Sequence, residues 1–347
     1  MGDRDRRAET AERTATRARR ARELRSLLVD QLAAVIGRGA QVGFLDFPFH
    51  TNPEDAMIFE GTMSAFAELS IDVVRLSDQA AYRRDDYASL PADTTMVFHG
   101  GGNFGDLFPW IHDQRLAEMV DLADFPLVVM PQTLTYATDA GLAETRRIVA
   151  SLPRLTLLWR DASSLARATD LFPTARSLLV PDAAFGLAPS PRRRSRGPLR
   201  VEVLARNDAS SSGLHLVDAG PWPVADWRYR RTGWGAAGVA LAVDRAVLER
   251  TRHLPALAQA RTTRWLLDQH ARLLGTIALH GGLGRSDAVV VDRLHAWITA
   301  ALTGVDVVAT DTVEPKIAPL VSTWFPGDGS LAPTPEAAIA EARARWT

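Results

Sequence analysis

The chain has 347 residues, a formal net charge of −1, 46% hydrophobic residues, 23% charged residues and no cysteine. These values are typical of a globular protein long enough for two domains. They exclude disulfides and thiolate metal sites, and they give no general attraction to nucleic acid or to anionic membranes. Because the N-terminus is charged from Asp3 and no apolar run is long enough to span a bilayer, we expect a soluble, cytoplasmic protein with at most peripheral membrane contact.

Residues 1–40 are predicted to form a charged tail and a helix. The stretch 1–22 is rich in arginine, glutamate and alanine and is expected to be a solvated helix or a frayed tail. Apolar residues at helical spacing then predict an amphipathic helix between Leu24 and Val35.

An N-terminal Rossmann-like domain is predicted over 41–188. Short apolar, β-branched runs that read as strands alternate here with helical patterns, which indicates a parallel sheet. The expected strands are 41–47, 71–76, 94–98, 127–130, 155–159 and 177–180. Polar or glycine residues follow most of them, and the carboxyl edge of such a sheet is where a ligand cleft is built.

The glycine-rich stretch from His99 to Asp106 follows one of these strands. Its glycines allow a ligand to approach the backbone closely and present N–H groups as an anion-binding nest. Gly100, Gly102 and Gly105 also match the dinucleotide fingerprint, but the match is weak, since the next strand ends in Pro131-Gln132 without the acidic ribose partner.

A linker is predicted at 189–198, followed by a C-terminal Rossmann-like domain over 199–330 and a helix within 331–347. This second domain is expected to hold a first strand at 199–204, helices over 246–274 and a strand at 276–280. Three tryptophans in its serine- and glycine-rich part read as packing residues, with a sugar-binding platform as the alternative: Trp222, Trp227 and Trp234.

The stretch 286–316 is the strongest candidate for the chemistry. Its pattern predicts a strand at 288–291, a helix capped by Asp292 and ended by Gly304, and a second parallel strand at 305–309. Arg293 and His295 would then lie at a strand end and a helix N-terminus, which suits an anion and a proton transfer. The alternative is a capped helix start with a structurally satisfied histidine.

Lys316 is the single lysine of the sequence, against 39 arginines. A compact ammonium retained in an arginine-biased chain suggests a site that needs this shape of cation. The alternative is that Lys316 lies on a surface turn and has been retained by chance.

Several stretches, in this order, resemble the polysaccharide pyruvyltransferase family: HTNPEDAMI, HGGGNFGDLFPWIHDQR, FPLVVMPQT, Arg160-Asp161 with Ser164, PDAAF, LARND, DRLHAWI, and Asp311 with Lys316. The resemblance covers about 42–325. It implies a GT-B-like fold in which two Rossmann-like domains face each other across a cleft. It also implies transfer of pyruvate from phosphoenolpyruvate to two hydroxyls of a sugar, glycolipid or polysaccharide precursor, which forms a cyclic ketal.

By this resemblance, Arg160, Arg293, Leu294 and His295 would hold phosphoenolpyruvate, with His295 as the general acid. Asp55 and His112 would line the acceptor side as further catalytic residues. The charges of phosphoenolpyruvate and the expected nest add further donor-binding candidates: Arg206, Lys316, Gly101, Gly102 and Asn103. No cofactor and no metal are expected, with phosphoenolpyruvate acting as a co-substrate.

The sequence departs from the family pattern in two loops. The first loop has Asn52-Pro53-Glu54-Asp55 where Asn-x-Gly-Asp is common, and the lysine motif begins Asp311-Thr312 instead of Asp-Asn. Two alternative functions follow: a GT-B glycosyltransferase that uses a nucleotide sugar, and a catalytically inactive sugar- or anion-binding relative. The acceptor sugar and its linkage are not specified by the sequence.

Overall fold

The computed structural model describes residues 3–48, 52–79, 82–188, 199–208, 210–227 and 286–347, with a few isolated positions between 243 and 283. The chain forms two compact units. Unit 1 comprises Met1–Ser26, Leu187–Trp234 and Gly275–Thr347, and unit 2 comprises Leu27–Gly186 and Gly235–Leu274. The sequence predictions for 189–198 and 276–280, almost all of 246–274, and Trp234 lie outside the described residues.

Unit 2 is built on a seven-stranded sheet in which every pairing is parallel, as predicted. Its strands are β1 (Gln41–Leu45), β2 (Asp72–Leu76), β3 (Thr95–Phe98), β4 (Gly101–Phe104), β5 (Leu127–Leu134), β6 (Leu155–Trp159) and β7 (Arg176–Leu179). They follow the order β2-β1-β3-β5-β6-β7, and β4 pairs with β5 off this path. The helices are α2 (Pro53–Glu68), α3 (Pro109–Asp121), α4 (Asp139–Ala150) and α5 (Ala162–Leu171).

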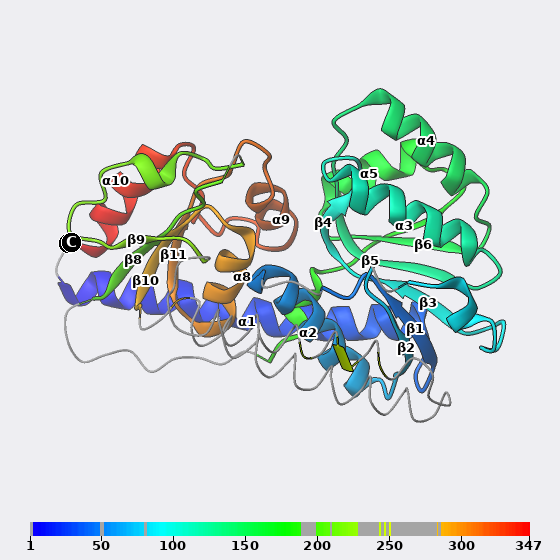
Figure 1. The fold of residues 1–347 in the computed structure, drawn as a ribbon. Helices are drawn as coiled ribbons and strands as arrows, with labels where there is room; N and C mark the ends of the chain where they lie inside the picture. Colours follow the sequence, from blue (N-terminus) through cyan, green and yellow to red (C-terminus); the bar gives the residue numbers. More distant parts are fainter. Residues whose placement is uncertain are drawn as a thin grey trace. The chain divides into compact units, whose positions relative to one another are not determined.

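Apolar side chains cover both faces of this sheet, because alternate strand residues point to opposite sides. The helices α3, α4 and α5 cover one face (Figure 1). There, strand residues such as Phe98 and Leu157 pack with Leu116, Ile148 and Ala168 of these helices. On the other face, residues such as Phe44 and Val97 pack with α2 and with Leu28, Val29 and Leu32. The strands are therefore buried on both sides, as in other parallel sheets.

Unit 1 holds a second parallel sheet in the order β11-β10-β8-β9. Its strands are β8 (Val201–Leu204), β9 (Val224–Ala225), β10 (Ala288–Val291) and β11 (Asp306–Ala309), and its helices include α8 (Leu294–Thr303), α9 (Ile317–Trp324) and α10 (Pro335–Trp346). The helix α8 ends at Gly304, whose φ of 70° is the left-handed conformation that glycine adopts without strain. The predicted strand–helix–strand pattern at 288–309 is confirmed.

Each sheet has a point where the chain reverses its direction of winding. In unit 2 this point lies between β1 and β3, and in unit 1 between β8 and β10, since each of these pairs is adjacent in its sheet. In open parallel α/β sheets, ligands bind beyond the carboxyl ends of the strands at such a switch point. The fold therefore marks one candidate edge in each unit.

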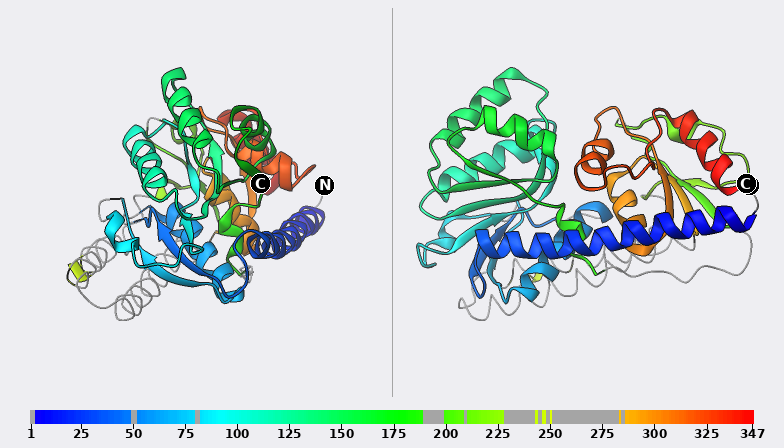
Figure 2. Two further views of the ribbon diagram at one scale, coloured as in Figure 1. Left: turned by 90° about the vertical axis from the view of Figure 1, so that its right-hand side faces the viewer. Right: turned by 180° about the vertical axis from the view of Figure 1, so that it is seen from behind.

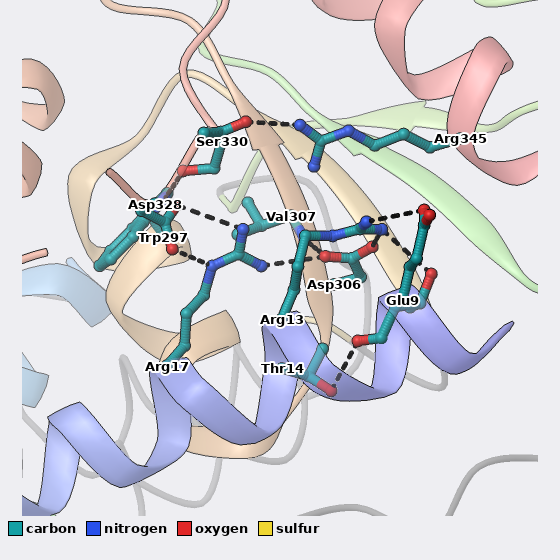
Figure 3. A network of polar contacts seen from close by, with 12 residues as sticks. Glu9, Arg13, Thr14, Arg17, Trp297, Asp306, Val307, Asp328, Ser330 and Arg345 are labelled. Carbon is teal, nitrogen blue, oxygen red and sulfur yellow. Dashed lines mark hydrogen bonds and ion pairs between the residues drawn. The ribbon is translucent and has the colours of Figure 1, made fainter. Parts of the chain in front are cut away.

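The helix α1 (Asp3–Val35) begins far earlier than the apolar pattern predicts, and it is one unbroken helix (Figure 2). The expectation of a solvated segment over 1–22 is wrong for Arg13 and Arg17. Arg17 is 1% exposed, and its guanidinium bonds Asp306 (2.9 Å) and Asp328 (2.6 Å), while Arg13 bonds the other oxygen of Asp306 at 2.9 Å (Figure 3). The partners Asp306 and Asp328 are far away in the sequence. The pattern of apolar residues therefore does not show that the side of α1 with Arg13 and Arg17 is covered.

The Asp306 carboxylate is the centre of this network. It also accepts a hydrogen bond from Nε1 of Trp346 at 3.1 Å. Burial alone would raise the pKa of Asp306, but the hydrogen bond from Arg13 and the charge of Arg17 outweigh burial and lower the pKa. Since Asp306 opens β11, the network lies at the amino end of the strands, away from the carboxyl edge of the same sheet.

In the described part of the chain, two strands and one α-helix were not predicted: β4, β9 and α9. Among the described residues no helix is long and apolar enough to cross a membrane. The same part of the chain contains no group of three or more histidine or carboxylate residues placed to hold a metal ion.

Candidate functional site

Asp46 marks the carboxyl end of β1, at the switch point of unit 2. It has a φ of 60°, which is uncommon for a non-glycine residue, and its carboxylate accepts a 2.5 Å bond from Nε of the buried Arg115. At the end of β3, the carbonyl of His99 accepts from Gln132 Nε2 at 2.7 Å. This edge therefore carries a buried polar cluster, and a strained residue at such a place is typical of a binding site.

Glu118, on α3, belongs to the same cluster. It is 2% exposed, and its carboxylate accepts a 3.0 Å bond from Gln114 Nε2. Burial and the negative charge of Asp46 raise the pKa of Glu118 to about 8, against a smaller opposing effect of Arg115. Glu118 is therefore protonated near neutral pH.

Asp55 lies beside the glycine-rich stretch. It is in the first turn of α2, and it accepts a 2.6 Å bond from Nδ2 of Asn52, which caps this helix. A Cβ added to Gly101 would lie 3.7 Å from Asp55 Oδ1, so the structure brings these two predicted residues together. Pro53 occupies the first helical position, where proline is favoured, so the altered loop motif is compatible with this helix start.

The glycine-rich stretch forms a short strand and not the turn of a dinucleotide site. Gly101 lies opposite Gln132 and Phe104 opposite Leu134 in the pairing of β4 with β5. The predicted donor-binding residues Gly102 and Asn103 lie between them in β4.

A positive φ explains why two positions of this stretch are glycine. Gly101 has a φ of 130° and Gly105 a φ of 134°, and a Cβ on Gly105 would meet the carbonyl oxygen of Thr135 at 1.6 Å. The glycines thus serve backbone packing against β5 as well as any contact with a ligand.

His112 is placed in the interior of unit 2. It is 1% exposed, its Nδ1 accepts from the backbone N–H of Gly105 at 3.3 Å, and its Nε2 lies 2.8 Å from Oγ1 of Thr145. Burial, followed by the charge of Arg115, lowers the pKa of His112 to about 4. Both ring nitrogens of this neutral histidine are engaged by the protein, so the geometry is that of a residue that positions Gly105.

Arg160 follows β6 and is also buried. Its Nε donates to Thr133 Oγ1 at 2.7 Å and its NH1 donates to Asp182 at 2.9 Å. Its backbone N–H donates to the carbonyl of Gln132, which connects Arg160 to the strand that carries the glycine stretch. In unit 2 the structure therefore links Asp55, Gly101, Gln132 and Arg160 along one edge of the sheet.

In unit 1, Asp292 joins the two loops at the switch point. Its carboxylate accepts from the backbone N–H of Arg206 and from the hydroxyl of Ser212, both at 2.7 Å. The expectation that Asp292 caps α8 is wrong, because Arg293 is the N-cap residue and makes no side-chain capping bond. The Asp292 carboxylate instead fixes the loop after β8 against the end of β10.

Arg293 forms a bidentate, buried ion pair with Asp226, which follows β9. The Nε–Oδ1 distance is 2.8 Å and the NH2–Oδ2 distance is 2.9 Å. Asp208 lies 3.9 Å from the same guanidinium and 2.6 Å from Nε of Arg206. The two predicted arginines of this edge are thus brought together around one shared carboxylate, that of Asp208, although Arg206 is more exposed than Arg293.

Leu294 and His295 occupy the first turn of α8, directly after Arg293. Both side chains are 5% exposed, and the backbone carbonyl of His295 accepts from Thr299 Oγ1 at 2.6 Å. Arg293, Leu294 and His295 are therefore held together by the start of one helix, at the carboxyl end of β10, where the helix dipole favours an anion.

Lys316 precedes α9. The Asp311 carboxylate accepts from the backbone N–H groups of Lys316, Ile317 and Ala318, each at 2.8 Å, and so it caps this helix. The Lys316 side chain is 20% exposed, and its Nζ lies 3.9 Å from Glu314. The role of Asp311 explains the spacing of the lysine motif: the aspartate fixes the backbone that carries the lysine.

Several residues of these edges were not predicted as site residues from the sequence: Asp46, Arg115, Glu118, Gln132 and Asp226. Asp226 follows a strand of only two residues, too short for a periodic signal, whereas Gln132 follows a recognisable apolar run.

The alternative of a sugar platform at the tryptophans fails for two of them. Trp227 is 3% exposed, and Trp222 packs against the core of unit 1 with its ring 6.1 Å from that of Trp346.

The fold and its two edges define an open parallel α/β protein with arginines at both switch points. Residues 55–312 match the family model of polysaccharide pyruvyl transferases, and the chain belongs to this family of transferases.

Individual proteins agree with this assignment. The chain is 30% identical over 299 residues to "Pyruvyl transferase 1" of Schizosaccharomyces pombe, covering 83% of this chain and 70% of that protein. It is 24% identical over 304 residues to "Putative pyruvyl transferase EpsO" of Bacillus subtilis, which covers 85% of this chain and 89% of that protein. A crystal structure of a functionally uncharacterised Klebsiella pneumoniae protein is similar to this chain with a TM-score of 0.54 and 15% identity. The similarity covers 90% of this chain and 99% of that chain, and it supports the fold alone.

Proposed function

We propose that this protein transfers pyruvate from phosphoenolpyruvate to two hydroxyls of a carbohydrate acceptor and releases phosphate. The observation that carries this proposal is the placement of Arg293 and His295, two positions apart, at the N-terminus of α8 and at a topological switch point. Membership of the polysaccharide pyruvyl transferase family supports the reaction class.

The donor is bound as an anion. Phosphoenolpyruvate carries a carboxylate and a phosphate, and Arg293 and Arg206 offer guanidinium groups whose orientation is set by Asp226 and Asp208. A guanidinium held in place by a carboxylate loses little freedom when it binds a second anion, so the ion pair prepares the site. Lys316 adds a compact cation from the loop before α9.

The reaction needs one acid and one base. His295 protonates the enol carbon of the donor, which leaves an oxocarbenium-like centre that an acceptor hydroxyl attacks. The carbon–oxygen bond to phosphate then breaks, and a second hydroxyl closes the ketal, so that phosphoenolpyruvate and a diol give the ketal and phosphate. General acid catalysis of this kind contributes about 10²–10⁴-fold.

Asp55 is our candidate for the base that takes the hydroxyl proton, because it lies beside the glycine stretch at the other switch point. His112 receives no acid–base role, since both its ring nitrogens are engaged inside unit 2. We further propose Arg160 as an additional donor contact.

Phosphate release tests the function. We expect the wild-type protein to release phosphate from phosphoenolpyruvate only when a carbohydrate acceptor is present, with a pyruvate ketal detected in the product by mass spectrometry. The His295→Asn variant is the matched negative control. Release of a nucleotide from a nucleotide sugar would instead identify a glycosyltransferase. Binding of either donor without turnover of any acceptor would identify an inactive relative.

A further inference from the structure

Two aromatic side chains stand exposed beside the glycine stretch. Phe108 is 41% exposed and Trp110 is 67% exposed, and they are the two exposed large aromatic residues among those the structure describes. They lie at the N-terminus of α3, whose N-cap residue is Phe108. Exposed aromatic surface beside a substrate edge marks a binding surface more often than a structural feature.

The backbone that carries this pair is rigidly mounted. The Asp106 carboxylate accepts hydrogen bonds from the N–H groups of Ala137 and Thr138 and from the Thr138 hydroxyl. On the helix side, Gln79 donates to the carbonyl of Ile111 at 3.0 Å. The segment from 106 to 111 is thus fixed at both ends, and a side chain on a rigid segment contributes its surface to a ligand with little loss of conformational entropy.

The chemistry around the pair favours a carbohydrate. Asp113 is exposed and lies three residues after Trp110, hence on the same side of α3. An indole face packs against the C–H groups of a pyranose ring, while a neighbouring carboxylate accepts hydrogen bonds from its hydroxyls. The exposed apolar surface of Phe108 and Trp110 extends over only about one helical turn. A stable protein interface buries a much larger surface, roughly 800 Å² per partner.

We propose that Trp110, with Phe108, forms a platform that binds a pyranose ring of the acceptor, and that Asp113 contributes a hydrogen-bond acceptor to it. The inference deepens the proposed function, on which it rests, by naming the surface that recognises the acceptor. The position fits, because the pair follows β4 (Gly101–Phe104), which begins next to Asp55, and because Ile111, in the first turn of α3, is bonded by Gln79 beyond the carboxyl end of β2. Trp110 thus acts in substrate binding and takes no part in bond making.

A binding experiment tests the platform without turnover. Methyl β-galactoside, methyl β-glucoside, methyl α-mannoside and lactose are titrated at millimolar concentrations while intrinsic tryptophan fluorescence is recorded. We expect at least one of them to change the emission of the wild-type protein, and the Trp110→Phe variant to lack most of this change. Loss of the aromatic surface in Trp110→Ala should weaken that sugar roughly ten-fold, as measured by calorimetry.

The matched control is Val120→Ala, which removes another exposed apolar side chain from the same helix. It should leave sugar binding unchanged. The phosphoenolpyruvate affinity should be unchanged in all three variants, because the platform does not touch the donor.

Two outcomes overturn the platform: sugar affinity in Trp110→Ala equal to wild type, or no response of the wild-type protein to any of the four sugars. A change of oligomeric state in Trp110→Ala by light scattering, with unaltered sugar binding, would assign the surface to a second copy of the chain. These results are independent of phosphate release. If Trp110-dependent sugar binding is found but no phosphate is released, the proposed function fails and the platform stands.

Discussion

Arg293 meets Asp226 through two hydrogen bonds of 2.8 and 2.9 Å, and both side chains are buried. The arginine at the N-terminus of α8 is therefore not an open charge but one whose plane is fixed by a carboxylate 67 residues earlier in the chain. This pair can take part in anion binding only if the guanidinium of Arg293 contacts both the ligand and Asp226. The role of Arg293 can therefore be tested by substituting Asp226.

The Asp226→Asn variant should be less stable than wild type but should gain more from the donor. Breaking a buried ion pair costs about 3–5 kcal/mol, because the remaining charge loses its partner. An anion bound to Arg293 would offset part of this loss. We therefore expect a lower melting temperature and a larger upward shift on adding phosphoenolpyruvate than in wild type.

The control for this prediction is Asp328→Asn, which removes a partner of the buried Arg17 in the same unit. It should lower the melting temperature without enlarging the shift caused by phosphoenolpyruvate. Equal shifts in Asp226→Asn and wild type would show that the donor does not contact Arg293.

His295→Asn should keep most donor affinity and lose turnover. Asparagine can hydrogen-bond to the donor but cannot deliver a proton, and general acid catalysis typically contributes about 10²–10⁴-fold. The measurements are calorimetric titration with phosphoenolpyruvate and steady-state phosphate release. Turnover close to that of wild type would move the acid role to another residue.

Lys316→Arg should leave the melting temperature unchanged and sharply lower phosphate release. The helix cap by Asp311 uses backbone N–H groups and so survives the substitution, but a planar guanidinium places its charge differently from an ammonium. A misplacement of about 1 Å can cost on the order of 10²-fold in rate.

The control is Glu314→Gln, which alters only the carboxylate 3.9 Å from the lysine and should change phosphate release little. Wild-type activity of Lys316→Arg would remove Lys316 from the site.

Glu118→Gln should flatten the dependence of stability on pH. The pKa of Glu118 is raised from 4.5 to about 8 in the folded protein, so between these values the folded state binds more protons than the unfolded state. The stabilising effect of the protonated carboxyl is complete below about pH 4.5 and is lost as pH rises through about 8, at up to about 1.4 kcal/mol per pH unit. Relative to wild type, Glu118→Gln should therefore gain stability between pH 5 and pH 9.

Urea unfolding of Glu118→Gln and wild type across this pH range measures the effect. The surface variant Glu144→Gln serves as the control, because Glu144 is exposed and pairs with Arg147 on the same helix. Parallel stability curves for Glu118→Gln and wild type would mean that Glu118 is ionised in the folded protein.

The parts of the fold that could be predicted from the sequence are those whose signal is local. The strand at 288–291, the helix after it and the glycine that ends it are encoded in about 20 consecutive residues, and they place Arg293 and His295 at a helix start. The parallel character of the sheets followed from the alternation of strands and helices. The proposed roles of Arg293 and His295 stay predictions until they are measured.

The parts that could not be predicted depend on partners far away in the chain. Asp226 orients Arg293 across 67 residues, and Arg17 finds Asp306 across 289. The exposure of Phe108 and Trp110 could not be predicted for another reason: both lie in a stretch that resembles the family, and only exposure distinguishes a surface aromatic residue from a packed one. A pattern of residue types does not report exposure.

The buried Arg17 of α1 has a consequence for synthesis on the ribosome. At roughly 5–20 residues per second, Arg17 is added to the chain about 15–60 s before its partner Asp306. During that interval Arg17 has neither Asp306 nor Asp328 to pair with, although the segment Leu27–Gly186 is completed before Asp306 is made. In a nascent chain interrupted before β11, Arg17 would therefore lack both carboxylates, and we expect the first part of α1 to pack in place only after β11 and Asp328 have been made.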